Sequence, residues 1–179
     1  MGQQTTSSYL PSIASLADQD AIERQFNELI QRIDEEEYGL TEGMDFPDED
    51  LNYFGIMSWE EVNFQDIETL YEFSWRIIEV VRRIDIRRNR IDKILYWLND
   101  KIYKAISMMP PNVLAYDTYD VKVHKLANKY PAFKLLLVEK NDYERLKLHW
   151  KNTAEALDKK ERIITRLTTR KENQNVPTS

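Results

Sequence analysis

The chain has 179 residues and a formal net charge of −6, and charged residues make up 31% of it. Only four glycines and six prolines interrupt it, which favours a predominantly helical protein of one domain with added segments. The absence of cysteine excludes disulfides, thiolate chemistry and cysteine-based zinc sites. No apolar run approaches the roughly 20 residues of a membrane span, so no membrane partner is expected.

The charge is divided unevenly along the chain. Residues 33–75 hold 14 acidic side chains and no lysine or arginine, whereas the residues from 76 onward carry a formal charge of +10. This asymmetry predicts an acidic segment attached to a basic body, and it is an indication about binding partners rather than about fold.

The N-terminal part is expected to hold one short helix. Residues 1–17 are rich in polar residues and are predicted to be a disordered tail, although Gly2 also fits the loose pattern for N-myristoylation. A helix is predicted from about 18 to 37, ended by Gly39 and Gly43. Its apolar face would be formed by Ile22, Phe26, Leu29, Ile30 and Ile33.

The short helix and an acidic, aromatic-rich arm together make up the predicted segment 18–57. Residues 38–57 are open to two interpretations: a regulatory arm that orders on a basic partner, or a linker whose aromatic residues pack against the helices. A third hypothesis is that the arm mimics DNA and covers the basic part of this chain.

The next predicted element is a long helix with a sustained heptad pattern. Ser58 and Glu61 fit a capping box, and the helix is expected to run from there to about Ile106, before Pro110 and Pro111. One row of its seam holds Leu70, Ile77, Ile84, Ile91, Leu98 and Ala105, and the companion row holds Ser74, Val81, Arg88, Leu95 and Ile102. About five such heptads are typical of a helix packed along its length against other helices, and Arg88 within the seam would restrict register or oligomer size.

A short helix is predicted to end at Lys129, capped by Asp117 or Thr118, and a second long helix to run from Pro131 to about Lys171. Its heptad row is Leu136, Tyr143, Trp150, Leu157 and Ile164, with Leu146, Thr153 and Leu167 beside it. The predicted fold is all-α: a coiled-coil-like antiparallel hairpin over 58–171, followed by a loose tail at 172–179. Further apolar residues outside the seam, such as Val80, Ile94 and Leu148, predict a homo-oligomer.

Basic residues and an aromatic residue recur on another face of the first long helix. Lysine and arginine neutralise phosphates, and aromatic rings stack on unpaired bases. The predicted nucleic-acid-binding residues are Arg76, Arg83, Arg87, Arg88, Arg90, Lys93, Trp97, Lys101 and Lys104, with Tyr96 and Tyr103 as further rings. The alternative is a solvated coiled-coil face whose arginines pair with Asp85, Asp92 or Asp100.

A second basic cluster ends the last helix. It consists of Lys159, Lys160, Arg162, Arg166, Arg170 and Lys171. Complementarity to the C-terminal helix dipole is an alternative explanation for these charges.

No pattern of a catalytic or metal site is present. His124 and His149 lack a partner at ligand spacing, and there is no glycine-rich phosphate loop or nucleophile elbow. The sequence therefore predicts a protein that is not an enzyme and has no metal or cofactor.

The arrangement from about 70 to 170 resembles the UvsY-type recombination mediators of large tailed phages. The similarity lies in Lys159, Arg162-Ile163, Arg166-Leu167 and Arg170, with Asn128-Lys129-Tyr130 at the start of the last helix. The resemblance implies a ring-forming helical protein that binds single-stranded DNA, touches a recombinase and a single-strand-binding protein, and helps to load the recombinase. It also implies that the DNA-contacting basic residues lie late in the first long helix, where the matching positions are Arg87, Arg88, Arg90, Lys93, Lys101 and Lys104. The paired tyrosines and glycine that end the family's first helix are missing here, and the acidic arm has no recognised counterpart.

Two functions from different classes follow. The first is a non-enzymatic oligomer that binds single-stranded DNA in recombination or replication, located in the cytoplasm, which would be the host's if the chain is phage-encoded. The alternative is a structural or adaptor coiled coil of a virion or complex, without affinity for nucleic acid.

Overall fold

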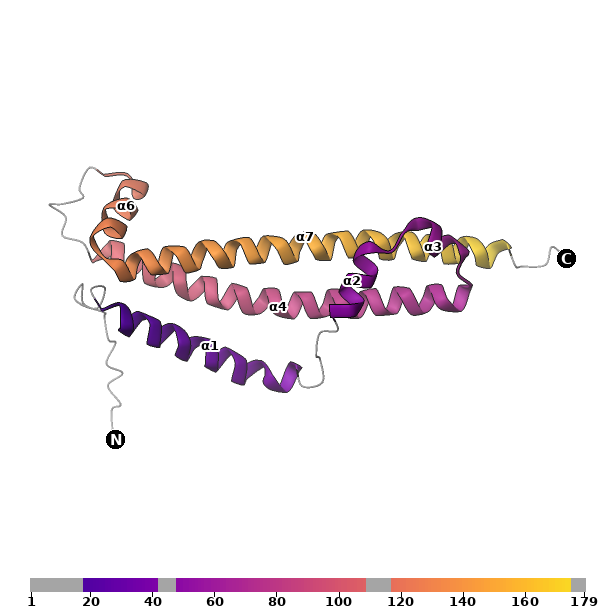
Figure 1. Cartoon of the computed structure of the whole chain (residues 1–179), viewed down its shortest axis with the longest axis horizontal. Coiled ribbons are helices and arrows are strands. Elements are labelled where there is room, and N and C mark those ends of the chain that lie inside the picture. Colours follow the sequence, from indigo (N-terminus) through magenta and orange to yellow (C-terminus); the bar gives the residue numbers. More distant parts are fainter. Residues whose placement is uncertain (1–17, 42–47, 109–116, 175–179) are drawn as a thin grey trace, which may run out of the picture. The chain divides into compact units, whose positions relative to one another are not determined.

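The computed structural model describes residues 18–41, 48–108 and 117–174, with the side chains at 37–41 and 48 left out. The predicted tail at 1–17, Gly2, Gly43 and Pro110-Pro111 lie outside these ranges. The described residues are helical and hold no strand, which confirms the all-α prediction (Figure 1). The helices are α1 Gln19–Thr41, α2 Asp48–Ile56, α3 Trp59–Phe64, α4 Ile67–Ser107, α6 Tyr119–Lys129 and α7 Pro131–Gln174.

The capping residues explain where two of these helices begin. The predicted capping box is confirmed, since the Ser58 hydroxyl accepts from the Glu61 amide and the Glu61 carboxylate accepts from the Ser58 amide. The prediction of one continuous helix from there was wrong, because α3 ends at Phe64. The Asp66 carboxylate then accepts from the Thr69 amide at 2.7 Å and starts α4 as a separate helix.

Other helix ends differ from the predictions by a few residues. Gly39 was predicted to end the first helix, but α1 continues through it to Thr41, since one glycine costs only about 1 kcal/mol in a helix. Pro131 begins α7 as predicted, and Thr118 is the N-cap residue of α6. Because α7 continues to Gln174, the predicted tail at 172–179 begins inside a helix.

The helices form two compact units. Unit 1 joins α1 up to Glu35 with Lys93–Glu144, and unit 2 joins Glu36–Asp92 with the residues from Arg145 onward. The single hairpin domain predicted at 58–171 thus contributes to both units, because α4 and α7 each pass through both. Within each unit, a part of α4 packs antiparallel to a part of α7.

In unit 1, α1 covers the paired parts of α4 and α7. The buried core residues are Ile22, Leu29, Ile33, Ile94, Leu98, Ile102, Ala105, Leu126, Ala132, Phe133 and Leu136. The apolar face predicted for the first helix thus packs on the seam of the long helix.

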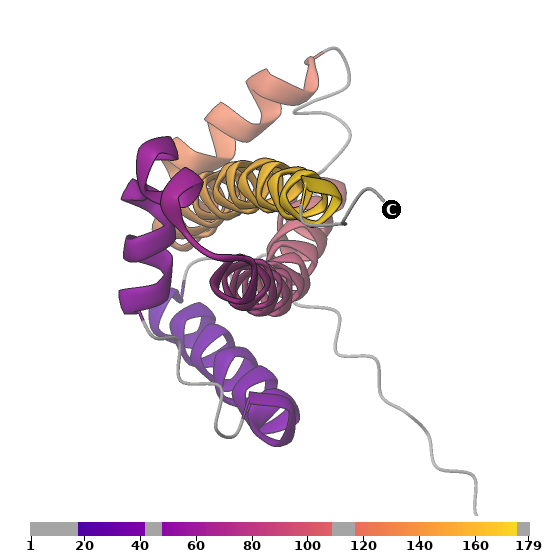
Figure 2. The same cartoon turned by 90° about the vertical axis from the view of Figure 1, so that its right-hand side faces the viewer.

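In unit 2, α2 and α3 lie against α4 and α7, as Figures 1 and 2 show from two directions. The core residues are Phe54, Met57, Val62, Leu70, Phe73, Ile77, Val80, Ile84, Ala154, Leu157 and Ile164. Phe54 is fully buried. Of the two interpretations of residues 38–57, the one in which aromatic residues pack against the helices is therefore correct at this position.

The predicted seam of the first long helix is confirmed. All six residues of its first row, from Leu70 to Ala105, are buried, while Arg88 in the companion row is half-buried. The heptad seam predicted for α7 is confirmed only in part, because Leu157 is buried but Leu146 is 40% exposed.

Candidate nucleic-acid interface

Arg76 begins the basic row predicted on α4, and its guanidinium is held by the acidic arm. It pairs with the Asp50 carboxylate of α2 and lies 3.6 Å from that of Glu72. It also lies over the rings of Tyr53 and Phe54, at 5.9 and 5.3 Å from their centres. The hydrogen bond to Asp50 raises the pKa of Arg76. Arg76 is therefore engaged in holding α2 on α4.

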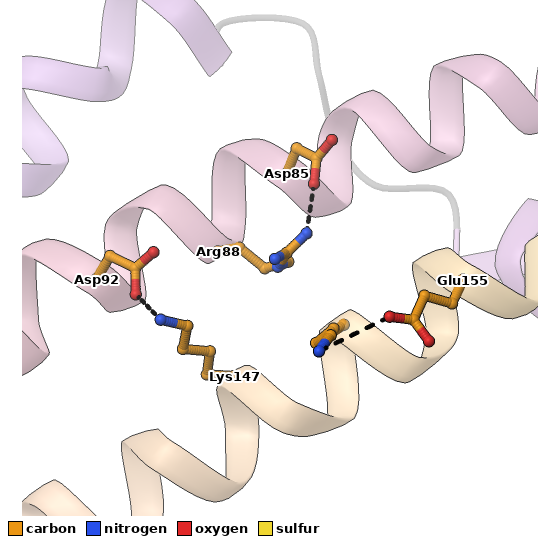
Figure 3. Close-up of polar contacts among 6 residues, drawn as sticks. Asp85, Arg88, Asp92, Lys147 and Glu155 are labelled. Atoms are coloured by element: carbon orange, nitrogen blue, oxygen red, sulfur yellow. Dashed lines mark hydrogen bonds and ion pairs between the residues drawn. The ribbon is translucent and has the colours of Figure 1, made fainter. Parts of the chain in front are cut away.

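The middle of the row, still in unit 2, is also engaged with the chain's own side chains. Arg88 Nη1 lies 2.8 Å from the Asp85 carboxylate. The carboxylate of Asp92, which was a predicted partner of these arginines, lies 2.5 Å from Lys147 of α7 (Figure 3). The Arg87 guanidinium lies 5.2 Å from the Trp150 ring centre. Arg83 and Arg90 are half-buried and also interact with other groups.

In unit 1, α1 covers the aromatic member of the row. Trp97 is half-buried, with its ring centre 5.7 Å from that of Phe26. Lys101 Nζ lies 5.1 Å from the Trp97 ring centre and donates to Gln25 at 2.8 Å. Burial, and then repulsion from Lys104, lowers the pKa of Lys101.

The remaining predicted residues of unit 1 lie at the surface or pair along α4. Lys104 pairs with Asp100 at 2.7 Å, which fits the alternative of charges that only pair along the helix. Lys93 is exposed and also interacts with another group of the chain. Tyr96 and Tyr103 are 79% and 70% exposed.

The second basic cluster, at the end of α7, divides into two groups. Lys160 Nζ donates to the backbone oxygens of Phe54, Gly55 and Met57, at 2.9 Å for Gly55 and 3.3 Å for Met57. Lys171 Nζ donates to those of Asn63 and Gln65, at 2.8 and 2.5 Å. These oxygens lie at the C-terminal ends of α2 and α3, where helices leave carbonyls unsatisfied. The two lysines therefore cap the helices of the arm.

The other group forms an exposed row along α7. It consists of Lys159, Arg162, Arg166 and Arg170, three or four residues apart on one face of the helix. In the described part of the chain these four side chains make no hydrogen bond or ion pair with another residue. We refer to them as the α7 basic row.

A groove between α3 and α7 adjoins this row. Its volume is about 420 Å³, and it is lined by Trp59, Glu60, Asn63, Ile163, Arg166, Leu167 and Arg170. A smaller hollow of about 110 Å³ shares Trp59 and Ile163 with it and reaches Lys159. The Trp59 side chain is 51% exposed, so a large aromatic ring is accessible beside positive charge.

Trp59 is a candidate residue that the sequence reasoning missed. It lies in the acidic segment, far along the chain from the basic cluster, so no spacing rule joins the two. The capping box at Ser58 could have indicated it. A helix that begins directly after Ser58 has Trp59 as its first residue, in the exposed first turn.

Other kinds of site find little support in the described residues. They contain no group of three histidine, aspartate or glutamate side chains that could hold a metal ion. Among the helices that the structure describes, none is long and apolar enough to span a bilayer.

The fold and the groove define an all-helical protein with an exposed cationic face beside an aromatic ring. No protein-family model, curated protein or solved structure matches the chain. The similarity to recombination mediators therefore stays a prediction.

Proposed function

We propose that this protein is a non-enzymatic protein that binds single-stranded DNA through the α7 basic row and Trp59. The observation that supports this best is a row of four exposed cations, without partners among the described residues, three of which line the groove or the hollow that contains the accessible Trp59. The cations would neutralise phosphates, and the indole ring would stack on an unpaired base. A duplex keeps its bases stacked, so the tryptophan favours single strands.

The proposal moves the binding surface from α4 to α7. The cations predicted on α4 are largely engaged with other groups of the chain, including Asp50 at Arg76 and Asp85 at Arg88. A further cavity, in unit 1, is lined by Glu23 and Glu139 and, among the described residues, by no lysine or arginine, so its charge disfavours a phosphate. In the groove, by contrast, Arg166 and Arg170 outweigh Glu60. The α7 basic row is thus the better candidate.

The resemblance to recombination mediators extends the proposal. It suggests an accessory role in recombinase loading in the cytoplasm, with a recombinase and a single-strand-binding protein as partners. Three residues that carry this resemblance, Arg162, Arg166 and Arg170, belong to the α7 basic row. The resemblance itself implies DNA contacts late in α4, so on the place of the site the proposal departs from it.

Fluorescence anisotropy with labelled single-stranded DNA at several salt concentrations tests the proposal. Each phosphate contact contributes about 0.7 to the slope of log affinity against log salt for single strands. The triple variant K159Q/R166Q/R170Q should therefore bind more weakly, with a slope smaller by about 2.

The matched control is K101Q/K104Q/K125Q, which removes the same charge from α4 and α6. It should bind as the wild type does. Loss of binding in this control alone would place the site among the cations of α4 and α6, and no binding by the wild type at low salt would refute the proposal.

The second candidate is a structural or adaptor coiled coil. The pairs Arg88–Asp85 and Lys104–Asp100 favour it, because paired charges of this kind fix helix surfaces without a ligand. This candidate predicts no affinity for DNA, so the same titration separates the two functions.

A further inference from the structure

An apolar stripe on α4 lies at the surface of unit 2. Tyr71, Trp75 and Ile78 are 55%, 66% and 47% exposed, and their spacing of four and three residues places them on one face of the helix. Only the edge of the stripe is engaged within the described residues, since the Tyr71 hydroxyl donates to Glu172 at 2.6 Å. Contiguous exposed apolar residues rimmed by polar ones mark interaction surfaces.

Opposite charges flank the stripe symmetrically. Glu68 lies seven residues before Trp75 and Arg82 lies seven residues after it, and both are exposed. Seven residues are close to two helical turns, so the two charges lie on the same face as Trp75, about 10 Å to either side of it. Within its own helix, Arg82 Nη1 lies 3.8 Å from the Glu79 carboxylate, which is beyond hydrogen-bond distance. The face therefore carries Glu68, the apolar stripe and Arg82 in that order along the helix.

We propose that a second copy of this chain binds the stripe, with the two α4 helices antiparallel and Trp75 at the two-fold axis. In this arrangement Glu68 of each copy faces Arg82 of the other, so the two-fold axis creates two favourable acid–base pairs. Parallel pairing would set Glu68 against Glu68 and Arg82 against Arg82, which is repulsive. The acid–base symmetry about Trp75 thus selects a second copy in the antiparallel sense.

The dimer is expected to be weak. Three apolar and two charged side chains from each copy bury less than the roughly 1,200 Å² of a stable interface, which places the contact among transient ones. It does not involve the α7 basic row, so this inference holds or fails independently of DNA binding.

Sedimentation velocity over a range of protein concentrations, without DNA, tests the proposal through charge reversal. The variants R82E and E68R should each dimerise at least several-fold more weakly than the wild type, because like charges then face each other. Mixing the two variants should restore association, since each mixed contact again joins an acid to a base. A structural role of either side chain would not produce this rescue.

Two further variants complete the experiment. Trp75→Ser should remove association, whereas Lys134→Glu, a charge reversal on α7 in unit 1, should leave it unchanged. Circular dichroism melting verifies that each variant is folded. A wild type that stays monomeric at every concentration, or a mixture of R82E and E68R that fails to associate, would overturn the proposal.

Discussion

Some cationic side chains of this protein bind other groups of the chain, whereas others are exposed and available to a ligand. Neighbouring lysines on α7 have opposite roles: Lys160 is held by three backbone oxygens, while Lys159 is exposed beside the smaller hollow. The same contrast distinguishes Arg76, paired with Asp50, from Arg166. Whether a cation is available for a ligand is therefore decided residue by residue.

Trp59 is expected to be the stacking residue of the interface. Trp59→Ala should weaken binding of single-stranded DNA by about 1–3 kcal/mol, because one base–aromatic stack is lost. Binding should also quench tryptophan fluorescence in the wild type and much less in Trp59→Phe. Trp75→Phe is the matched control, since Trp75 is exposed to a similar degree on another helix, and it should keep the quenching.

Asp66 should stabilise the start of α4 in a manner that depends on pH. The hydrogen bond from the Thr69 amide lowers the pKa of Asp66 in the folded protein. Its contribution is therefore fully present above the unfolded value of about 3.9 and is lost as the pH falls through the lower folded value. Asp66→Ala should lower the melting temperature at neutral pH, and the difference from the wild type should shrink below about pH 4.

Asp66→Asn provides the control for this effect. Asparagine caps helices as well as aspartate does but carries no charge. Its melting temperature should stay close to that of the wild type at neutral pH, and a loss equal to that of the alanine variant would contradict the capping role.

At the scale of elements, the acidic arm is a structural part of unit 2. Phe54 and Met57 of the arm are buried in the core of this unit, and Lys160 of α7 caps α2. The following helix, α3, is held in the same way by the buried Val62 and by Lys171. Asp50, one of the acidic residues of the arm, has a structural partner in Arg76. The hypothesis of a regulatory arm stays a prediction.

The lysine caps lead to a prediction that separates stability from binding. Lys160→Met keeps the apolar stem but loses the hydrogen bonds of the ammonium group, so the free energy of unfolding should fall by about 1–3 kcal/mol. Lys159→Met should change stability by less than about 0.5 kcal/mol and instead weaken DNA binding. Chemical denaturation and anisotropy on both variants measure the two effects.

The DNA-mimic hypothesis for the arm can be tested at Asp50. If the arm competes with DNA for Arg76, Asp50→Asn should tighten binding of single-stranded DNA. If DNA binds the α7 basic row, as proposed, the affinity should stay the same. This substitution is cleaner than deleting residues 33–57, which would also remove the buried Phe54.

At the scale of the whole molecule, the two units have separate cores. The core of unit 1 contains Phe133 and that of unit 2 contains Phe54, and both side chains are fully buried. The long helices α4 and α7 pass through both units, so each helix is stabilised by two different sets of contacts.

Separate cores predict local effects of core substitutions. Phe54→Ala should cost about 3–5 kcal/mol and raise amide hydrogen exchange mainly in α2, α3 and the part of α7 in unit 2. Phe133→Ala should act mainly on α6 and the part of α4 in unit 1. Mass spectrometry of exchange distinguishes them, and equal loss of protection in both units from either variant would show one cooperative core instead.

The long helices and their buried seam can be predicted from local patterns in the sequence. The row from Leu70 to Ala105 repeats every seven residues, and this periodicity follows from helix geometry and burial alone. The capping box at Ser58 and the helix start at Pro131 are equally local. Local signals of this kind need no knowledge of distant residues.

Which charges are available to a ligand depends on how the folded chain packs. A basic row on a helix looks the same in sequence whether solvent or another helix lies against it. Asp50 reaches Arg76 across 26 residues, and Lys160 reaches Gly55 across 105. Such contacts between distant residues moved the candidate interface from α4 to the groove beside Trp59, because packing, rather than periodicity, determines which side chains can meet a ligand.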